Sequence, residues 1–138
     1  MATGQPQILN VLEFGVTDLQ LDDQTVHEGD SFNITVDFEG KGWIWAFLEW
    51  ISDNIGILNA TTNFYAEGMG AGAQEFDLGS TATPLASGAA YSATLTVNTS
   101  AATTLLLEGV YRIQCLVQVE GSAIMGYYPD DLLLSVYD

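Results

Sequence analysis

Two pairs of neighbouring aspartates, at positions 22–23 and 130–131, fall in segments typical of turns, where carboxylate oxygens could gather around a cation. Calcium takes about six to eight oxygen ligands, and the Asp-x-Asp-x-Asp-Gly loop that often supplies them is absent from the sequence. In so acidic a chain, paired aspartates are more often solvated turn residues. We therefore keep Asp22, Asp23, Asp130 and Asp131 as weak calcium candidates only, and expect no bound metal or cofactor.

Glu49 is the only charged residue in the aromatic segment 43–50. A glycosidase needs two carboxyl groups on either side of a cleft, one of them with a raised pKa. The sequence places no second acid opposite Glu49, so a hydrolase has only this one residue in its favour. We expect Glu49 to face solvent at a strand end, or to pair with Lys41 or Arg112.

Nucleophilic catalysis is not indicated by the single cysteine and the single histidine. Cys115 lies in an alternating apolar row, which predicts a small buried hydrophobic residue, and one cysteine excludes an internal disulfide. His27 lies in a turn-like segment that nothing in the sequence connects to Cys115. Because zinc-ligand spacing and a glycine-rich phosphate loop are also absent, we expect the protein not to be an enzyme.

The three tryptophans are the best candidates for an interaction surface. We expect the segment 43–51 to be a strand, which would place Trp43 and Trp45 on one face and Trp50 on the other. Sandwiches often bury a tryptophan, so Trp43 and Trp45 are expected in the core. At least one of Trp43, Trp45 and Trp50 is expected to be exposed and able to stack on a sugar or insert into a partner protein.

Three stretches alternate apolar and polar residues with the period of a half-buried β-strand. These stretches are 31–38, 91–98 and 111–119. In the first, Phe32 and Ile34 begin an apolar row, and in the last Ile113 and Cys115 belong to one. Each stretch is therefore expected to bury one face against a common core.

Weaker patterns predict the remaining elements. We expect a strand at 8–21, with a break at Gly15, and a short strand around Val26. Further strands are expected at 43–51, 57–65, 74–78 and 132–137. A loop is expected at 79–88, and a loop or hairpin edge at 123–129. Seven or eight strands at this spacing predict an all-β fold, an immunoglobulin-like antiparallel β-sandwich. We expect one domain over 1–138, with residues 1–7 forming a flexible or partner-contacting arm.

Two short segments resemble the beginnings of strands in prokaryotic immunoglobulin-like domains, such as the CARDB-type, E-set-like cell-surface modules. In 26–36, Gly29 and Asp30 precede an alternating strand, and in 107–113, Gly109 comes two residues before Tyr111. The resemblance implies an immunoglobulin-like fold, which recurs on cell surfaces and in virus particles, and leaves the function open. The cysteine pair of antibody domains is missing.

Charge limits the partners of this chain. Its 138 residues include 18 acidic residues but only Lys41 and Arg112 as basic ones, giving a formal net charge of −16. Binding to a phosphate backbone depends on Lys and Arg, so nucleic acid and anionic membranes are not expected as partners. The sequence also contains no stretch approaching the roughly 18 apolar residues of a membrane span, so membrane insertion is not expected either.

We interpret the sequence as a non-catalytic structural module, most simply a virion component such as a capsid decoration or tail protein, or a cell-surface component. It would act through protein–protein contacts, by self-association or within a larger assembly, because 48% of the residues are hydrophobic. The beginning of the chain lacks the pattern of a cleaved signal peptide. The alternative is a secreted carbohydrate-binding sandwich that uses exposed tryptophans.

The sequence also contains three Asn-x-Ser/Thr sequons, the acceptor pattern for N-glycosylation, which begin at Asn33, Asn59 and Asn98.

The charge also predicts a halophilic protein. Self-repulsion destabilises the compact state of a strongly acidic chain, and salt screens that repulsion. We expect the melting temperature, followed by circular dichroism, to rise from low salt to molar NaCl. A melting temperature that does not change with NaCl would contradict this hypothesis.

Overall fold

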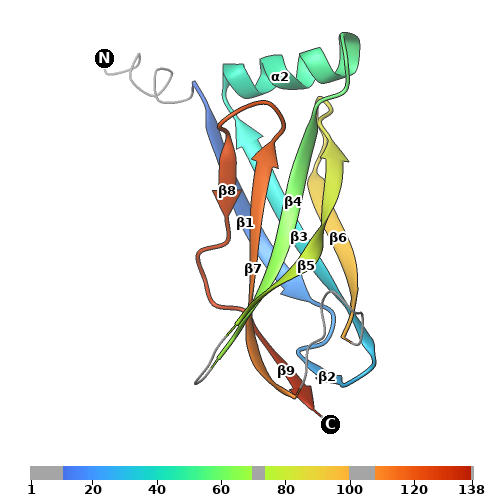
Figure 1. The fold of residues 1–138 in the computed structure, drawn as a ribbon. Helices are drawn as coiled ribbons and strands as arrows, with labels where there is room; N and C mark the ends of the chain where they lie inside the picture. Colours follow the sequence, from blue (N-terminus) through green and yellow to red (C-terminus); the bar gives the residue numbers. More distant parts are fainter. Residues whose placement is uncertain (1–10, 70–73, 100–107, 138) are drawn as a thin grey trace, which may run out of the picture.

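The alternating segments form strands in the computed structural model, which describes residues 11–69, 74–99 and 108–137. One sheet has three antiparallel strands in the order β1-β3-β6 (Figure 1). These strands are β1 (Glu13–Leu21), β3 (Ser31–Lys41) and β6 (Tyr91–Asn98).

The second sheet has six strands in the order β2-β9-β7-β4-β5, with β8 also paired to β7. All neighbours are antiparallel except β2 and β9. The strands are β2 (Thr25–His27), β4 (Asn59–Gly68), β5 (Glu75–Pro84), β7 (Gly109–Val119), β8 (Met125–Tyr127) and β9 (Leu133–Tyr137).

The two sheets enclose one hydrophobic core, which confirms the predicted all-β sandwich. Alternate residues of β3 and β7 are buried, including Ile34, Val36, Ile113 and Val117. Burying such a side chain contributes about 1.5–3 kcal/mol, as an upper estimate. Cys115 is a buried free thiol, as predicted, and its burial raises its pKa to about 11.

The segment expected to be a strand at 43–51 is instead a helix, α2 (Trp43–Asn54), which covers one end of the sandwich (Figure 1). Trp45, Leu48 and Ser52 face the core at helical spacing. A run that is apolar on all sides does not reveal its period, so the strand prediction was wrong for a clear reason. Gly42 precedes the helix with a φ of 98°, a conformation that favours glycine.

Two smaller expectations also differ from the structure. The predicted loop at 79–88 is largely the second half of β5, because residues up to Pro84 pair with β4. The first strand is irregular between Val16 and Asp18 rather than at Gly15. The arm predicted at 1–7 lies outside the described residues.

A close contact between Trp45 and Gly40 fixes the position of α2. A Cβ atom added to Gly40 would lie 2.1 Å from Cδ2 of the Trp45 ring. The ring therefore packs directly on the backbone of β3, near the point where that strand ends. Any side chain at position 40 would have to displace the indole and with it the helix.

We predict that Gly40→Ala lowers the free energy of unfolding by about 1–3 kcal/mol, the usual range for overpacking a core. Urea unfolding followed by circular dichroism measures the change. Gly15→Ala is the matched control, since a Cβ there meets nothing within 4 Å. Equal stability of the two variants would show that the Trp45 contact does not hold the helix.

Candidate functional site

The most unusual surface of the molecule is the solvent-facing side of α2. Trp43, Ala46, Phe47 and Trp50 share this side at helical spacing, and we call these four residues the outer face of α2. The side chains of Trp43, Phe47 and Trp50 are 64%, 52% and 50% exposed. The rings of Phe47 and Trp50 are stacked nearly parallel, with centroids 6.2 Å apart.

Two further apolar residues are exposed just after the end of the helix. Ile55 and Ile57 follow α2 and are 72% and 71% exposed. Scattered exposed apolar residues are ordinary, but a concentrated group of this size usually marks an interaction site. The helix is therefore apolar toward the core and apolar toward solvent as well.

The two acidic residues of α2 bind partners outside this outer face, and Asp53 remains exposed at its border, one turn after Trp50. The Tyr91 hydroxyl donates a hydrogen bond to the Glu49 carboxylate, and the backbone N–H of Ser87 donates to Asp53 at 3.1 Å. Both partners belong to the segment that leads into β6. The outer face of α2 consequently carries no charge, in a chain whose net charge is −16.

An aromatic cluster beneath the helix holds the outer face in place. Phe38 and Tyr91 are stacked at 5.3 Å, and the Trp45 ring lies 5.9 Å from Tyr91 and 5.2 Å from Phe14 between centroids. Such ring pairs contribute about 0.5–1.5 kcal/mol beyond their buried area. The cluster joins β1, β3 and β6 to α2 through side chains that are themselves buried or half-buried.

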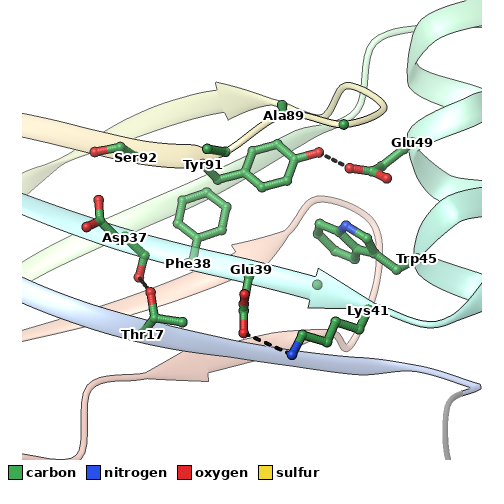
Figure 2. Close-up of a pocket in the computed structure, with 13 residues that line it drawn as sticks. Thr17, Asp37, Phe38, Glu39, Lys41, Trp45, Glu49, Ala89, Tyr91 and Ser92 are labelled. Carbon is green, nitrogen blue, oxygen red and sulfur yellow. Dashed lines mark hydrogen bonds and ion pairs between the residues drawn. The ribbon is translucent and has the colours of Figure 1, made fainter.

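A pocket of about 630 Å³ lies beside this cluster, between α2, the end of β3 and the beginning of β6 (Figure 2). Its polar lining includes Asp37, Glu39 and Glu49. The Nζ atom of Lys41 lies 3.5 Å from Oε1 of Glu39 and neutralises part of the negative charge of this lining. Because the neighbouring rings of Trp45 and Tyr91 are almost fully buried, the pocket offers carboxylates to a ligand but little aromatic surface.

Tyr91 is the residue of this pocket whose ionisation is most clearly perturbed. Burial of the hydroxyl, followed by its hydrogen bond to Glu49, raises the pKa of Tyr91 well above its usual value. The hydroxyl also accepts a hydrogen bond from the N–H of Ala86 at 3.0 Å. Tyr91 therefore stays neutral at ordinary pH and links α2 to the loop before β6.

The structure corrects several expectations about the candidate interaction residues. Trp45 is buried, as predicted, whereas Trp43 is exposed and does not lie in the core. Trp43 and Trp45 do not share a face, because a helix places them about 200° apart. Glu49 binds Tyr91 rather than Lys41 or Arg112. Arg112 instead pairs with Glu67 at 2.7 Å and with Asp131 at 3.4 Å.

Three of the four aspartates that were weak calcium candidates bind local partners. Asp22 accepts hydrogen bonds from the backbone and side chain of Asn33, and Asp23 accepts one from the N–H of Thr25. Asp131 pairs with Arg112, and Asp130 is exposed beside it. Within the described ranges, the acids, His27 and Cys115 form no group of three or more that could hold a metal ion.

Sequence reasoning missed Phe47, Ile55 and Ile57 as part of the apolar surface. Trp43, Phe47 and Trp50 recur at steps of four and three residues, which is the signal of a helix face. That signal was available, but the strand assignment for 43–51 concealed it.

No helix in the described part of the chain has the length and apolar character needed to cross a bilayer.

The sequence matches no protein-family model, and a search of curated proteins finds no significant relative. Solved structures share the fold at low identity. A β-glucosidase from Erythrobacter marinus is 13% identical with a TM-score of 0.55, over 91% of this chain and 16% of that protein. A superoxide reductase from Ignicoccus hospitalis is 11% identical with a TM-score of 0.51, over 88% of this chain and 82% of that protein.

A CARDB domain from Pyrococcus furiosus is 16% identical with a TM-score of 0.46, over 91% of this chain and 87% of that domain. A similarity this low carries no argument about this chain. The chain spans only about a sixth of the β-glucosidase, at 16% of its length, and identities this low carry no activity from one protein to another.

The expectation that the protein is not an enzyme is contradicted by these comparisons. A protein named as a reductase has the same fold over most of its length, so a sandwich of this kind does not exclude catalysis. The expectation rested on missing catalytic motifs in the sequence. A sequence motif is a poor guide here, because sites are assembled in space from residues that are distant along the chain.

We predict that Tyr91→Phe lowers the free energy of unfolding by about 1–2 kcal/mol, because the variant lacks the hydroxyl that bonds to Glu49 of α2 and to Ala86.

The free energy of unfolding of the wild-type protein should decrease as pH rises above about 10, since unfolded tyrosine ionises there while buried Tyr91 does not. Urea titrations at pH 8 and pH 10.5 measure both effects. Tyr127→Phe, at an exposed position, is the control and should keep the wild-type free energy of unfolding at pH 8.

Proposed function

We propose that this chain is a structural module that assembles with copies of itself through the outer face of α2. The exposure of Trp43, Phe47 and Trp50 on one uncharged helix face is the observation that carries this proposal. Aromatic residues of this kind dominate the binding energy of protein interfaces. The α2 helix is held rigidly from below by Trp45, so the surface is formed before a partner arrives.

The size of the apolar surface supports a protein partner. Large aromatic side chains cover ~150–250 Å² each. With half or more of their surface exposed, Trp43, Phe47 and Trp50 together present roughly 250–400 Å² of apolar surface on the outer face of α2. An apolar patch of this size is comparable to the largest patch of a typical monomer, which is often functional, and it would form the centre of an interface to which each partner contributes ~800 Å².

The distribution of charge supports a second copy as that partner. Two molecules of charge −16 repel one another over most of their surfaces. The α2 helix lies at one end of an elongated sandwich, opposite β2 and β9 (Figure 1). Contact through this end brings the uncharged outer faces of α2 together and places the acidic turns around β2 at the far ends of the pair, where their mutual repulsion is screened.

A place on a virion or cell exterior is the setting we propose for such an assembly. The resemblance of 26–36 and 107–113 to immunoglobulin-like surface modules favours it, and so does a surface that repels nucleic acid. Neighbouring genes for capsid and tail proteins would support the virion, whereas neighbouring secretion genes would support the cell surface.

The second candidate function is carbohydrate binding. The exposed rings of Trp43, Phe47 and Trp50 offer aromatic faces of the kind that can stack on a sugar. A glycan that quenches tryptophan fluorescence in the wild-type protein, but not in Trp50→Ser, would favour this alternative over self-assembly.

We predict a concentration-dependent dimer in sedimentation velocity, which becomes tighter as NaCl is raised because salt screens the repulsion between copies. Phe47→Ser should weaken the dimer at least 10-fold, since truncating a central aromatic residue typically costs more than ~1–2 kcal/mol. The matched control is Tyr137→Ser, at the opposite end of the molecule, where the side chain is similarly exposed. A strict monomer at all concentrations and salt levels would overturn the proposal.

A further inference from the structure

We infer that two copies pair through antiparallel α2 helices related by a two-fold axis that passes between Ala46 and Phe47. The inference rests on the proposed self-assembly and specifies its geometry. In this arrangement Trp43 of one copy lies opposite Trp50 of the other. Ala46 of each copy lies opposite Phe47 of its partner.

The spacing of the outer face leads to this geometry. Its four residues occupy relative positions 0, 3, 4 and 7 along the helix. Reversing the direction of the helix gives the same set of positions, so the surface is complementary to itself when one copy is turned around. The same spacing forms the contact seam when two helices pack with their side chains interlocked.

The side chains fit this reversal better than they fit a parallel pairing. In the antiparallel pair, the small Ala46 leaves room for the Phe47 ring of the other copy, and each Trp43 meets a Trp50. In a parallel pair, the two Ala46 side chains would face one another and the two Phe47 rings would compete for the same space. Packing a large side chain against a small one leaves fewer voids, so the antiparallel pair is favoured.

A contact of this kind closes on itself. Each copy uses the same surface, so pairing covers that surface on both copies. The assembly therefore stops at two copies rather than growing into a filament. The end of the sandwich that contains β2 and β9 then lies at the two outer poles of the dimer (Figure 1).

Cysteine cross-linking tests which residues meet. Trp43→Cys and Trp50→Cys are made as separate variants and oxidised with oxidised glutathione, alone and as an equal mixture. The mixture should give a covalent dimer, while either variant alone should give several-fold less. Cys115 is buried and does not compete. The control Ser31→Cys, exposed at the beginning of β3 and far from α2, should not cross-link (Figure 1).

A second experiment leaves all three tryptophans in place, so it tests the inference even if the Trp43→Cys and Trp50→Cys variants no longer associate. Spin labels on Lys41→Cys, an exposed position just before α2, report helix direction by pulsed electron paramagnetic resonance. Antiparallel helices should separate the labels by roughly 20 Å or more, because a 12-residue helix is about 18 Å long. Labels close together would indicate parallel helices.

The outcomes separate this inference from the proposed function. Cross-linking of each variant with itself, without gain in the mixture, would overturn the antiparallel pairing. A wild-type dimer that Phe47→Ser dissociates, but that gives neither the mixed cross-link nor the long label distance, would leave self-assembly standing and remove this geometry. A wild-type monomer would remove both.

Discussion

The contact of the Trp45 indole with the backbone at Gly40 is the constraint on which the rest of the site depends. The absence of a side chain at Gly40 lets the ring lie directly on β3, where a Cβ would come within 2.1 Å of it. The ring then joins Phe14, Phe38 and Tyr91 in one aromatic cluster. Because the indole is buried on one side of α2, the residues on the opposite side of the helix are forced toward solvent.

The unusual property of the molecule follows from this anchoring. An ordinary surface helix hides its apolar stripe and shows a polar side, whereas α2 is apolar on both sides. Its two acids are drawn to the flank, where Tyr91 and Ser87 bind them. A strongly acidic chain thus presents an uncharged, aromatic surface at the end of its sandwich, where another protein can approach without meeting a layer of carboxylates.

The low similarity to solved structures shows how little the sandwich itself says about function. The same fold occurs in a superoxide reductase and in one part of a β-glucosidase, at identities of 11% and 13%. A sandwich is a stable way to bury two apolar faces, and many activities are built on it. The feature of this chain that points to a partner is the helix between β3 and β4, with the aromatic residues that it displays.

The sequence alone determined the parts of the fold that depend on local pattern. Alternation in β3, β6 and β7 established the buried faces, and the same alternation is enough to place Cys115 in the core. The state of 43–51 could not be determined in this way, because a segment that is apolar on all sides fits a buried strand and a buried helix equally well. Only tertiary structure decided it, since packing of Trp45 on Gly40 sends Trp43 outward and brings Glu49 to Tyr91, two residues 42 positions apart in the chain. Such long-range contacts leave no periodic trace in a sequence, so the helical spacing of Trp43, Phe47 and Trp50 could be recognised as one exposed face only once the folded molecule had shown that 43–51 is helical.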